Sequence, residues 1–277
     1  MKNTDLIIFG GQSNMQGQTD SFPATNDPVE GAFEYRLISD SLVPLKHPVG
    51  ENLDLDGNEF ALDYTIQPQA LWRDPTATLA GYDINNDYIS ASMLPDFCRA
   101  YIEVTGRNVV AVHAAKGATT IEYWQKGGGA YNILVKKAKA AIEKVQPEHI
   151  YFVWLQGESN ALEKMPKEEY KRQLDMLNAS LRDDLGIEKF GMIQVGQFAI
   201  LVSEDRVKFD LEIINAQKEI CLENDDFLML TTVTEQLTKI PSYMNPVARG
   251  HYNYEGQKII GTFAGNALGR YKNSEQV

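Results

Sequence analysis

The sequence predicts a three-layer α/β/α sandwich built on a mainly parallel sheet of about five strands. Five short runs rich in β-branched and apolar residues are typical of parallel strands that are buried on both faces. Segments with helical spacing separate these runs, as parallel neighbours require of their crossover connections. The chain has 277 residues, of which 43% are hydrophobic and 23% charged, which is an ordinary globular composition.

The first expected strand opens the stretch LIIFGGQSNMQG, which covers residues 6–17. The four later strands are expected at 108–117, 149–159, 190–198 and 227–233. The helices between and after them are expected at about 90–105, 131–145, 166–185, 207–224 and 253–271. Strand and helix alternate throughout, so we expect residues 1–277 to form a single domain.

One long insertion interrupts this pattern at about 18–88. Its periodicity is weak, and it contains prolines at 23, 28, 44, 48, 68 and 75. Because loops of this length seldom lack structure of their own, we expect short elements here, lying over the functional site. A surface insertion without function is the alternative.

The net charge of −12 disfavours nucleic acid as a partner, because a nucleic-acid binder needs lysine and arginine to displace counterions. The six-residue apolar run near the N-terminus is too short for a signal peptide or a membrane span, so a cytoplasmic location without membrane contact is expected. Cys98 and Cys221 show no metal or disulfide spacing. No metal or cofactor is expected.

Ligands of open parallel sheets bind beyond the carboxyl ends of the strands. This rule selects three short segments as candidate site residues, namely 10–14, 116–118 and 156–160. It places His149 at the opposite edge, because this residue opens its strand.

Ser13 is the candidate nucleophile, because a serine in a strand-to-helix turn exposes its hydroxyl beside backbone N–H groups. A helix N-cap is the alternative role. The turn is not a G-x-S-x-G elbow, since Met15 replaces the second glycine. A phosphate cradle is disfavoured, because the turn has no lysine and no phosphate-binding glycine motif.

Four histidines are available as a base for Ser13. His47 lies in the insertion, and His113 lies inside a strand, where a core histidine is expected. His251 directly precedes the last helix and suits a general base carried on a loop at the carboxyl edge. A surface histidine, or a cap beside Asn253, is the alternative.

Four motifs together resemble the SGNH-hydrolase superfamily and, more narrowly, its carbohydrate esterase branch of family-six acetylxylan esterases and sialic acid O-acetylesterase-like domains. They are GGQSNMQG, AAKGATTIEYW (114–124), WLQGESNA (154–161) and GHYNYEGQ (250–257). The resemblance implies a flavodoxin-like SGNH hydrolase fold. It also implies a serine esterase that removes O-acetyl groups from a small carbohydrate through an acyl-serine intermediate.

The resemblance also assigns roles to individual residues. Ser13 matches the nucleophile, and its N–H would form the oxyanion hole with Gly117 and the side chain of Gln156. His251 matches the catalytic base.

One position departs from the pattern of many SGNH enzymes, which have an aspartate three residues before the histidine. Here that position is Ala248, so Glu158 of QGES is expected to orient the imidazole. Its alternative role is a structural carboxylate bonded to backbone amides. Substrate contacts are expected from Gln12, Asn14, His47 and Trp124.

Two other functions stay open at this point. The first is a non-catalytic carbohydrate-binding or scaffold protein on the same fold, which the missing aspartate favours. The second is a flavodoxin-like nucleotide module.

Overall fold

A seven-stranded sheet forms the centre of the computed structural model, which describes residues 2–51, 53, 91–198 and 203–274. The strand order is β3-β2-β4-β1-β5-β6-β7. All five expected strands are present, as β1 Thr4–Gly11, β4 Asn108–Ala115, β5 His149–Leu155, β6 Lys189–Ile193 and β7 Phe227–Thr231. These five strands are mutually parallel.

The order of these five strands is that of flavodoxin-like sheets. Taken in chain order, β4-β1-β5-β6-β7 reads 2-1-3-4-5, and the order reverses around β1. At the end of β1, Gly11 pairs with Ala115 of β4 and with Leu155 of β5. The turn after β1 therefore opens at the topological switch point, where such folds bind ligands.

Two further strands extend the sheet beyond the five that the sequence predicts. They are β2 Ala32–Arg36, which pairs parallel with β4, and β3 Ser41–Pro44, which pairs antiparallel with β2. Both lie in the predicted insertion and confirm that it carries short elements of its own. The prediction of about five strands was too low because both strands lie in a proline-containing stretch of weak periodicity, and proline is tolerated on an edge strand such as β3. Residues 54–90 of the insertion lie outside the described residues.

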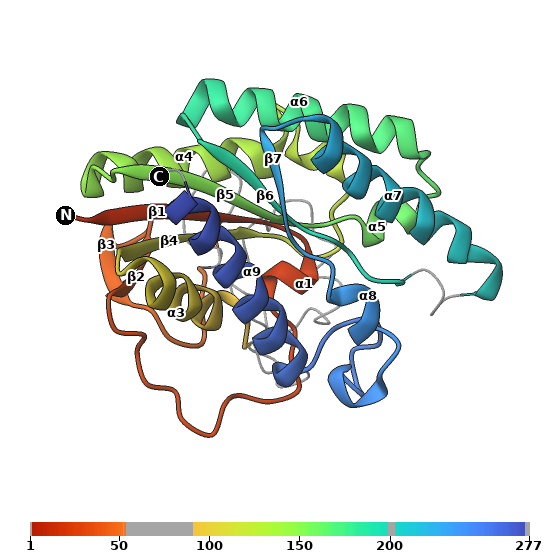
Figure 1. The fold of residues 1–277 in the computed structure, drawn as a ribbon, viewed down its shortest axis with the longest axis horizontal. Helices are drawn as coiled ribbons and strands as arrows, with labels where there is room; N and C mark the ends of the chain where they lie inside the picture. Colours follow the sequence, from red (N-terminus) through yellow and green to blue (C-terminus); the bar gives the residue numbers. More distant parts are fainter. Residues whose placement is uncertain (1, 52, 54–90, 199–202, 275–277) are drawn as a thin grey trace.

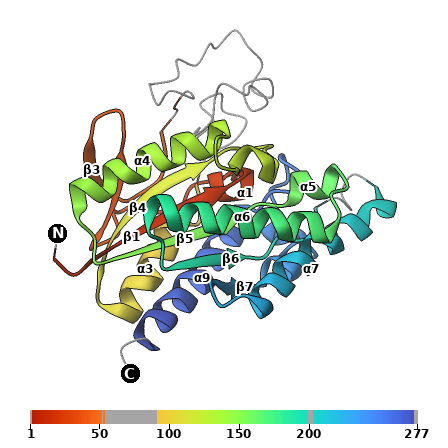
Figure 2. The ribbon, with the colours of Figure 1, turned by 90° about the horizontal axis from the view of Figure 1, so that it is seen from above.

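Helices cover both faces of the sheet (Figures 1 and 2). On one face α3 (Leu94–Thr105) packs against α9 (Tyr254–Ser274), and on the other α4 (Gly129–Val145) packs against α6 (Lys167–Leu185). Helix α7 (Val207–Glu223) packs against α6 and β7. The expected three-layer architecture is confirmed. Shorter elements are α1 Ser13–Gln16, η1 Ile121–Trp124, α5 Glu158–Leu162, η3 Glu204–Arg206, α8 Thr234–Leu237 and η4 Pro241–Tyr243.

The central strand β1 is buried along its whole length, as expected for a strand covered on both faces. His113, inside β4, is also fully buried, which confirms its predicted place in the core. His149 opens β5 and pairs with Glu188 at 3.0 Å, at the edge opposite the carboxyl ends. No helix in the described ranges is long and apolar enough to cross a bilayer.

A buried ion pair connects α4 to the chain that follows the β2-β3 hairpin. The Nζ of Lys137 lies 2.7 Å from a carboxylate oxygen of Glu51, and both side chains are almost completely buried. Glu51 also accepts hydrogen bonds from the N–H groups of Leu37 and Ile38, at 2.7 and 3.0 Å. These contacts fix the hairpin against the body of the fold.

Candidate active site

The turn after β1 depends on Gly11. Its φ is +144°, and a Cβ built there would lie 2.0 Å from the carbonyl oxygen of Leu155. Only glycine therefore allows the chain to approach β5 this closely, so that the N–H of Gln12 donates to the Leu155 oxygen at 3.1 Å. Gln12 occupies the N-cap of α1, and Ser13 is the first helical residue. The alternative that Ser13 caps the helix is wrong.

Ser13 and His251 are in direct contact. The Oγ of Ser13 lies 2.8 Å from Nε2 of His251, and Nδ1 of the same ring lies 3.1 Å from the carbonyl oxygen of Ala248. Because a carbonyl oxygen only accepts, Nδ1 carries the proton, and Nε2 is left to accept from the serine hydroxyl. Burial lowers the pKa of His251 to about 4, because it disfavours the charged imidazolium. The pair has the geometry of a nucleophile and its general base.

The loop before α9 brings His251 to this position. Gly250 has a φ of +86°, and a Cβ there would lie 1.9 Å from the ring of Phe198. The Phe198 ring in turn packs edge-on against the imidazole, with centroids 6.1 Å apart. The loop is thus shaped so that the imidazole faces β1.

Asn245 organises the same loop through four hydrogen bonds. Its Oδ1 accepts from the N–H groups of Val247 and Ala248, each at 2.9 Å. Its own N–H donates to the main-chain oxygen of His251 at 2.8 Å, and its Nδ2 donates to the main-chain oxygen of Gln18 at 2.8 Å. Asn245 therefore ties the Ala248 turn both to His251 and to the segment that follows the nucleophile.

The structure does not place Glu158 on the imidazole, contrary to the sequence-based expectation. Its Oε1 accepts from Nδ2 of Asn14 at 2.8 Å, and its Oε2 has no hydrogen-bond partner within the described part of the chain. The Nδ1 of His251 is already occupied by Ala248. Burial raises the pKa of Glu158 above its usual value.

Asn14 connects the nucleophile turn to the histidine loop. Besides Glu158, its Nδ2 reaches the main-chain oxygen of Gly250 at 3.3 Å, and its Oδ1 accepts from the N–H of Tyr252 at 3.3 Å. The main-chain oxygen of Asn14 accepts from Gln257 of α9 at 3.0 Å. With its carboxamide engaged in this way, Asn14 supports the Ser13 and His251 geometry instead of presenting a free contact to a ligand.

Gly117 lies beside Ser13, whereas Gln156 faces inward. A Cβ built on Gly117 would lie 3.6 Å from Cβ of Ser13, and the Gly117 N–H donates to Oε1 of Gln16 at 2.9 Å. The Nε2 of Gln156 is fully buried and faces three acceptors, which are Thr119 O (2.9 Å), Asn160 Oδ1 (2.6 Å) and Gln12 Oε1 (3.1 Å). An NH₂ group has two protons, so Gln156 has none to offer an oxyanion here.

The other predicted substrate contacts are also engaged within the protein. Gln12 Oε1 accepts from Gln156 and from the N–H of Ser159 (3.1 Å), which orders the turn after β5. Trp124 is fully buried against Trp154 and donates its indole N–H to Thr119. His47 is 4% exposed, accepts from the N–H of Ser92 at 3.3 Å, and packs edge-on against Tyr254.

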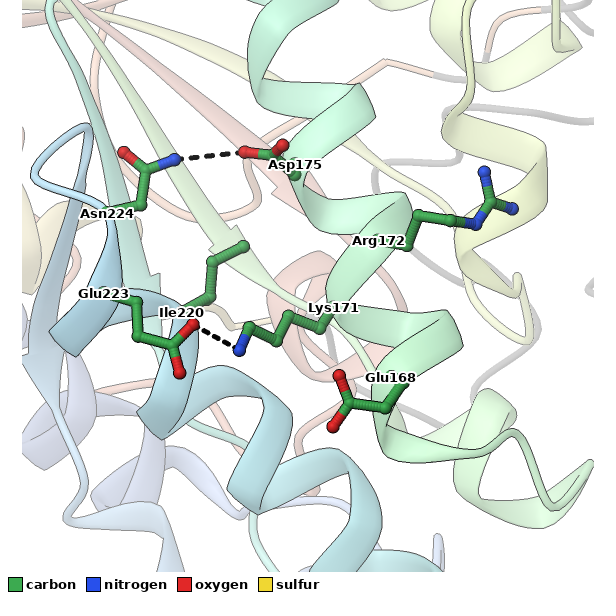
Figure 3. Close-up of a pocket in the computed structure, with 7 residues that line it drawn as sticks. All are labelled: Glu168, Lys171, Arg172, Asp175, Ile220, Glu223 and Asn224. Carbon is green, nitrogen blue, oxygen red and sulfur yellow. Dashed lines mark hydrogen bonds and ion pairs between the residues drawn. The ribbon is translucent and has the colours of Figure 1, made fainter.

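A polar groove lies between α6 and α7, and its lining does not include Ser13 or His251 (Figure 3). It encloses about 330 Å³. Its side chains bond to one another across the groove, since Lys171 pairs with Glu223 and Asn224 donates to Asp175 at 3.0 Å, while Arg172 points away from α7. These contacts are typical of a solvated interface between two helices.

Comparison with known proteins points in the same direction as the Ser13 and His251 geometry. Residues 3–262 match the model of the family described as "Carbohydrate esterase, sialic acid-specific acetylesterase". An Arabidopsis thaliana protein described as a probable carbohydrate esterase is 32% identical over 190 residues, which are 69% of this chain and 67% of that protein.

Several solved structures share the fold. An Arabidopsis thaliana protein superposes with a TM-score of 0.63 and 17% identity, and NanS with 0.65 and 12%; each comparison covers 98% of both chains. A carbohydrate acetylesterase from Xanthomonas citri gives a TM-score of 0.57 and 17% identity over 96% of this chain and 56% of that one.

Proposed function

Because the chain belongs to the carbohydrate esterase family described as sialic acid-specific acetylesterase, a family of carboxylic ester hydrolases, we propose that it removes O-acetyl groups from a carbohydrate with Ser13 as nucleophile. The observation that carries this proposal is the 2.8 Å contact between Ser13 Oγ and His251 Nε2. A hydroxyl so placed can transfer its proton to the imidazole as it attacks an ester carbonyl.

The first half-reaction forms an acyl-serine. Ser13 Oγ bonds to the acetyl carbon while its proton passes to Nε2 of His251, and the ester C–O bond then breaks as His251 returns this proton to the departing sugar alcohol. In the second half, water gives a proton to Nε2 of His251 as its oxygen bonds to the acyl carbon, and the bond between this carbon and Ser13 Oγ then breaks as His251 returns the proton to Oγ. Acetate and free Ser13 are the products.

The main-chain oxygen of Ala248 supports the imidazolium that forms during these steps. It accepts the hydrogen bond of Nδ1–H, with 3.1 Å between Nδ1 and the oxygen, so the ring keeps the tautomer and orientation in which Nε2 faces Ser13. A neutral carbonyl stabilises the imidazolium less than a carboxylate does, but it provides the same geometric constraint. The absent aspartate therefore does not favour a non-catalytic protein.

The oxyanion of the tetrahedral intermediate would be stabilised by the N–H groups of Ser13 and Gly117. Ser13 opens α1, where the first N–H groups of a helix have no intrahelical acceptor. The Gly117 N–H donates to Gln16 Oε1 at 2.9 Å in the structure, so it would serve the oxyanion only after this one side-chain acceptor is exchanged for the substrate oxygen. Losing one such donor typically lowers kcat about 100- to 1000-fold.

The acetylated carbohydrate is proposed from the family description and from the acidic character of the chain. A net charge of −12 suits a small substrate with little or no charge better than a polyanion. The candidate substrates are acetylated xylo-oligosaccharides, acetylated monosaccharides and O-acetyl sialic acid.

The test compares wild type with Ser13→Ala on p-nitrophenyl acetate and on these three kinds of sugar ester. We expect wild type to release acetate, and Ser13→Ala to lose at least about 10³-fold in kcat. Ser39→Ala, in the exposed β2-β3 turn, is the matched control. Circular dichroism establishes that each variant is folded, and unchanged activity in a folded Ser13→Ala enzyme would contradict the proposal.

A non-catalytic carbohydrate-binding protein is distinguished by covalent labelling. An organophosphate reacts only with an activated serine, so stoichiometric labelling of Ser13, absent in Ser13→Ala, is expected of the esterase. A protein that binds sugar esters but is not labelled would be the binding module instead.

A further inference from the structure

Gln18 is a buried polar residue that the proposed chemistry leaves without a role. Its side chain is only 2% exposed, and neither Nε2 nor Oε1 has a hydrogen-bond partner among the residues that the structure describes. Buried side-chain amides are nearly always bonded, so an amide with both ends unsatisfied among the described residues keeps a donor and an acceptor that a ligand can use.

The free amide lies beside the nucleophile. A Cβ built on Gly117 would lie 3.3 Å from Nε2 of Gln18 and 3.6 Å from Cβ of Ser13. Ser13 is 6% exposed and Gln18 2%, so both side chains lie below the surface, beside Gly117. The backbone of Gln18 is fixed in place, because its carbonyl oxygen accepts from Asn245 at 2.8 Å.

The neighbouring Gln16 is in a different state. Its Oε1 is occupied by the N–H of Gly117 at 2.9 Å, whereas Gln18 offers both a free donor and a free acceptor. An oxyanion only accepts hydrogen bonds and would leave Oε1 of Gln18 unpaired. Two neighbouring hydroxyls satisfy both ends, since one accepts from Nε2 and the other donates to Oε1.

We propose that Gln18 is a specificity-determining residue that binds two adjacent hydroxyl groups of the sugar whose ester Ser13 attacks. This inference rests on the proposed function and identifies what distinguishes its substrate from a simple acetate ester. A site built to bond hydroxyl groups selects against analogues that lack them, because its polar groups are then left unpaired.

The decisive variant is Gln18→Met, which keeps the length of the side chain and removes both polar atoms. We expect kcat/KM for a mono-O-acetylated methyl glycoside with free adjacent hydroxyls to fall about 10- to 100-fold, the effect of losing two neutral hydrogen bonds. The kcat/KM for p-nitrophenyl acetate, which has no hydroxyl, is expected to stay within about twofold of wild type.

The matched control is Gln173→Met. Gln173 is also a buried glutamine, 6% exposed, but it lies on α6 and donates to Glu169 at 2.7 Å. This variant is expected to leave kcat/KM for both esters unchanged. The melting temperature of each variant is measured alongside, and Gln18→Leu serves as a second apolar replacement should Gln18→Met fold poorly.

Binding is measured separately from turnover. In the Ser13→Ala background, calorimetric titration with the same glycoside is expected to show a Kd that rises about 10-fold or more when Gln18→Met is added.

Equal losses on both esters in a folded Gln18→Met enzyme would overturn the sugar contact and leave the esterase assignment intact, as would equal retention on both. A wild-type enzyme that turns over p-nitrophenyl acetate but no sugar ester would refute the proposed carbohydrate substrate and with it the ligand of Gln18.

Discussion

The main-chain oxygen of Ala248 accepts the Nδ1 proton of His251 at 3.1 Å, at the sequence position where many SGNH enzymes have an aspartate. Ala248 has no carboxylate to offer, but its main-chain oxygen takes the place of one as the acceptor for Nδ1. The imidazole is oriented without a carboxylate, and Glu158, 3% exposed, bonds to Asn14 instead.

This arrangement predicts a mild effect of Glu158→Gln. Replacing the acid of a serine triad by its amide lowers kcat about 10⁴-fold when the acid holds the histidine. Here the amide oxygen can still accept from Asn14 and does not meet the imidazole, so we expect a loss of about tenfold or less. Steady-state kinetics with p-nitrophenyl acetate measure it. A loss near 10⁴-fold in a folded variant would mean that Glu158 orients His251 after all.

Asn245 is predicted to control activity through the Ala248 turn. Asn245→Ala removes the acceptor for two N–H groups and the donor to Gln18, which lets the Ala248 oxygen and the imidazole shift. Because a misplacement of about 1 Å can cost about 100-fold, we expect kcat to fall about 10- to 100-fold. Asn245→Asp keeps the Oδ1 acceptor and should lose less. Equal kcat values for the two variants would show that the acceptor is not what matters.

The acid limb of the pH profile is predicted to lie low. His251 must be neutral to accept the serine proton, and burial lowers its pKa to about 4, so the active form persists well below the ordinary histidine pKa of about 6.5. We expect kcat/KM to fall to half its plateau near pH 4 to 5. Rates are measured from pH 3.5 to 8 after confirming that the enzyme stays folded. A midpoint near pH 6.5 would show that the ring is solvated in the working enzyme.

Stability is predicted to depend on Lys137. Lys137→Met leaves the buried Glu51 carboxylate without its cation, and removing one partner of a buried pair typically costs about 3–5 kcal/mol of unfolding free energy. Urea denaturation measures the loss. Lys139→Met is the control, because Lys139 lies two residues later in α4 and is exposed, and this change should alter stability by less than about 0.5 kcal/mol. Similar values for both variants would contradict a structural role for the pair.

The alternation of parallel strands and helices could be predicted from the sequence. Buried parallel strands such as β1 and β5 are nearly continuous apolar runs, and this pattern survives without any knowledge of the neighbours. Strands β2 and β3 could not be read, because they lie in a proline-containing stretch of weak periodicity, whereas β6 and β7, which are no longer than β2, follow and precede clear helical patterns. The pairing of β2 with β4 depends on contacts that are distant in sequence, and β3 is placed in the sheet by its pairing with β2.

The contact between Ser13 and His251 followed from placement at the carboxyl edge, but the directions of the side chains did not. Sequence motifs give residue types, whereas the orientation of Gln156 and Glu158 is decided by which internal acceptors and donors they meet. The hydrogen bonds of Asn245 and the burial of the Gln18 side chain were missed for the same reason. The one available signal was the cluster of three glutamines at 12, 16 and 18 around Ser13.

The Ser13–His251 hydrogen bond joins residues 238 positions apart. During translation Ser13 is made 238 residues before His251, and helix α9 is made after His251. The hydroxyl thus has no base until the histidine loop has folded against the turn after β1, so the proposed esterase activity would report that these distant parts of the chain have come together. The rate of hydrolysis of a fluorogenic acetate could therefore be used to follow the last steps of folding.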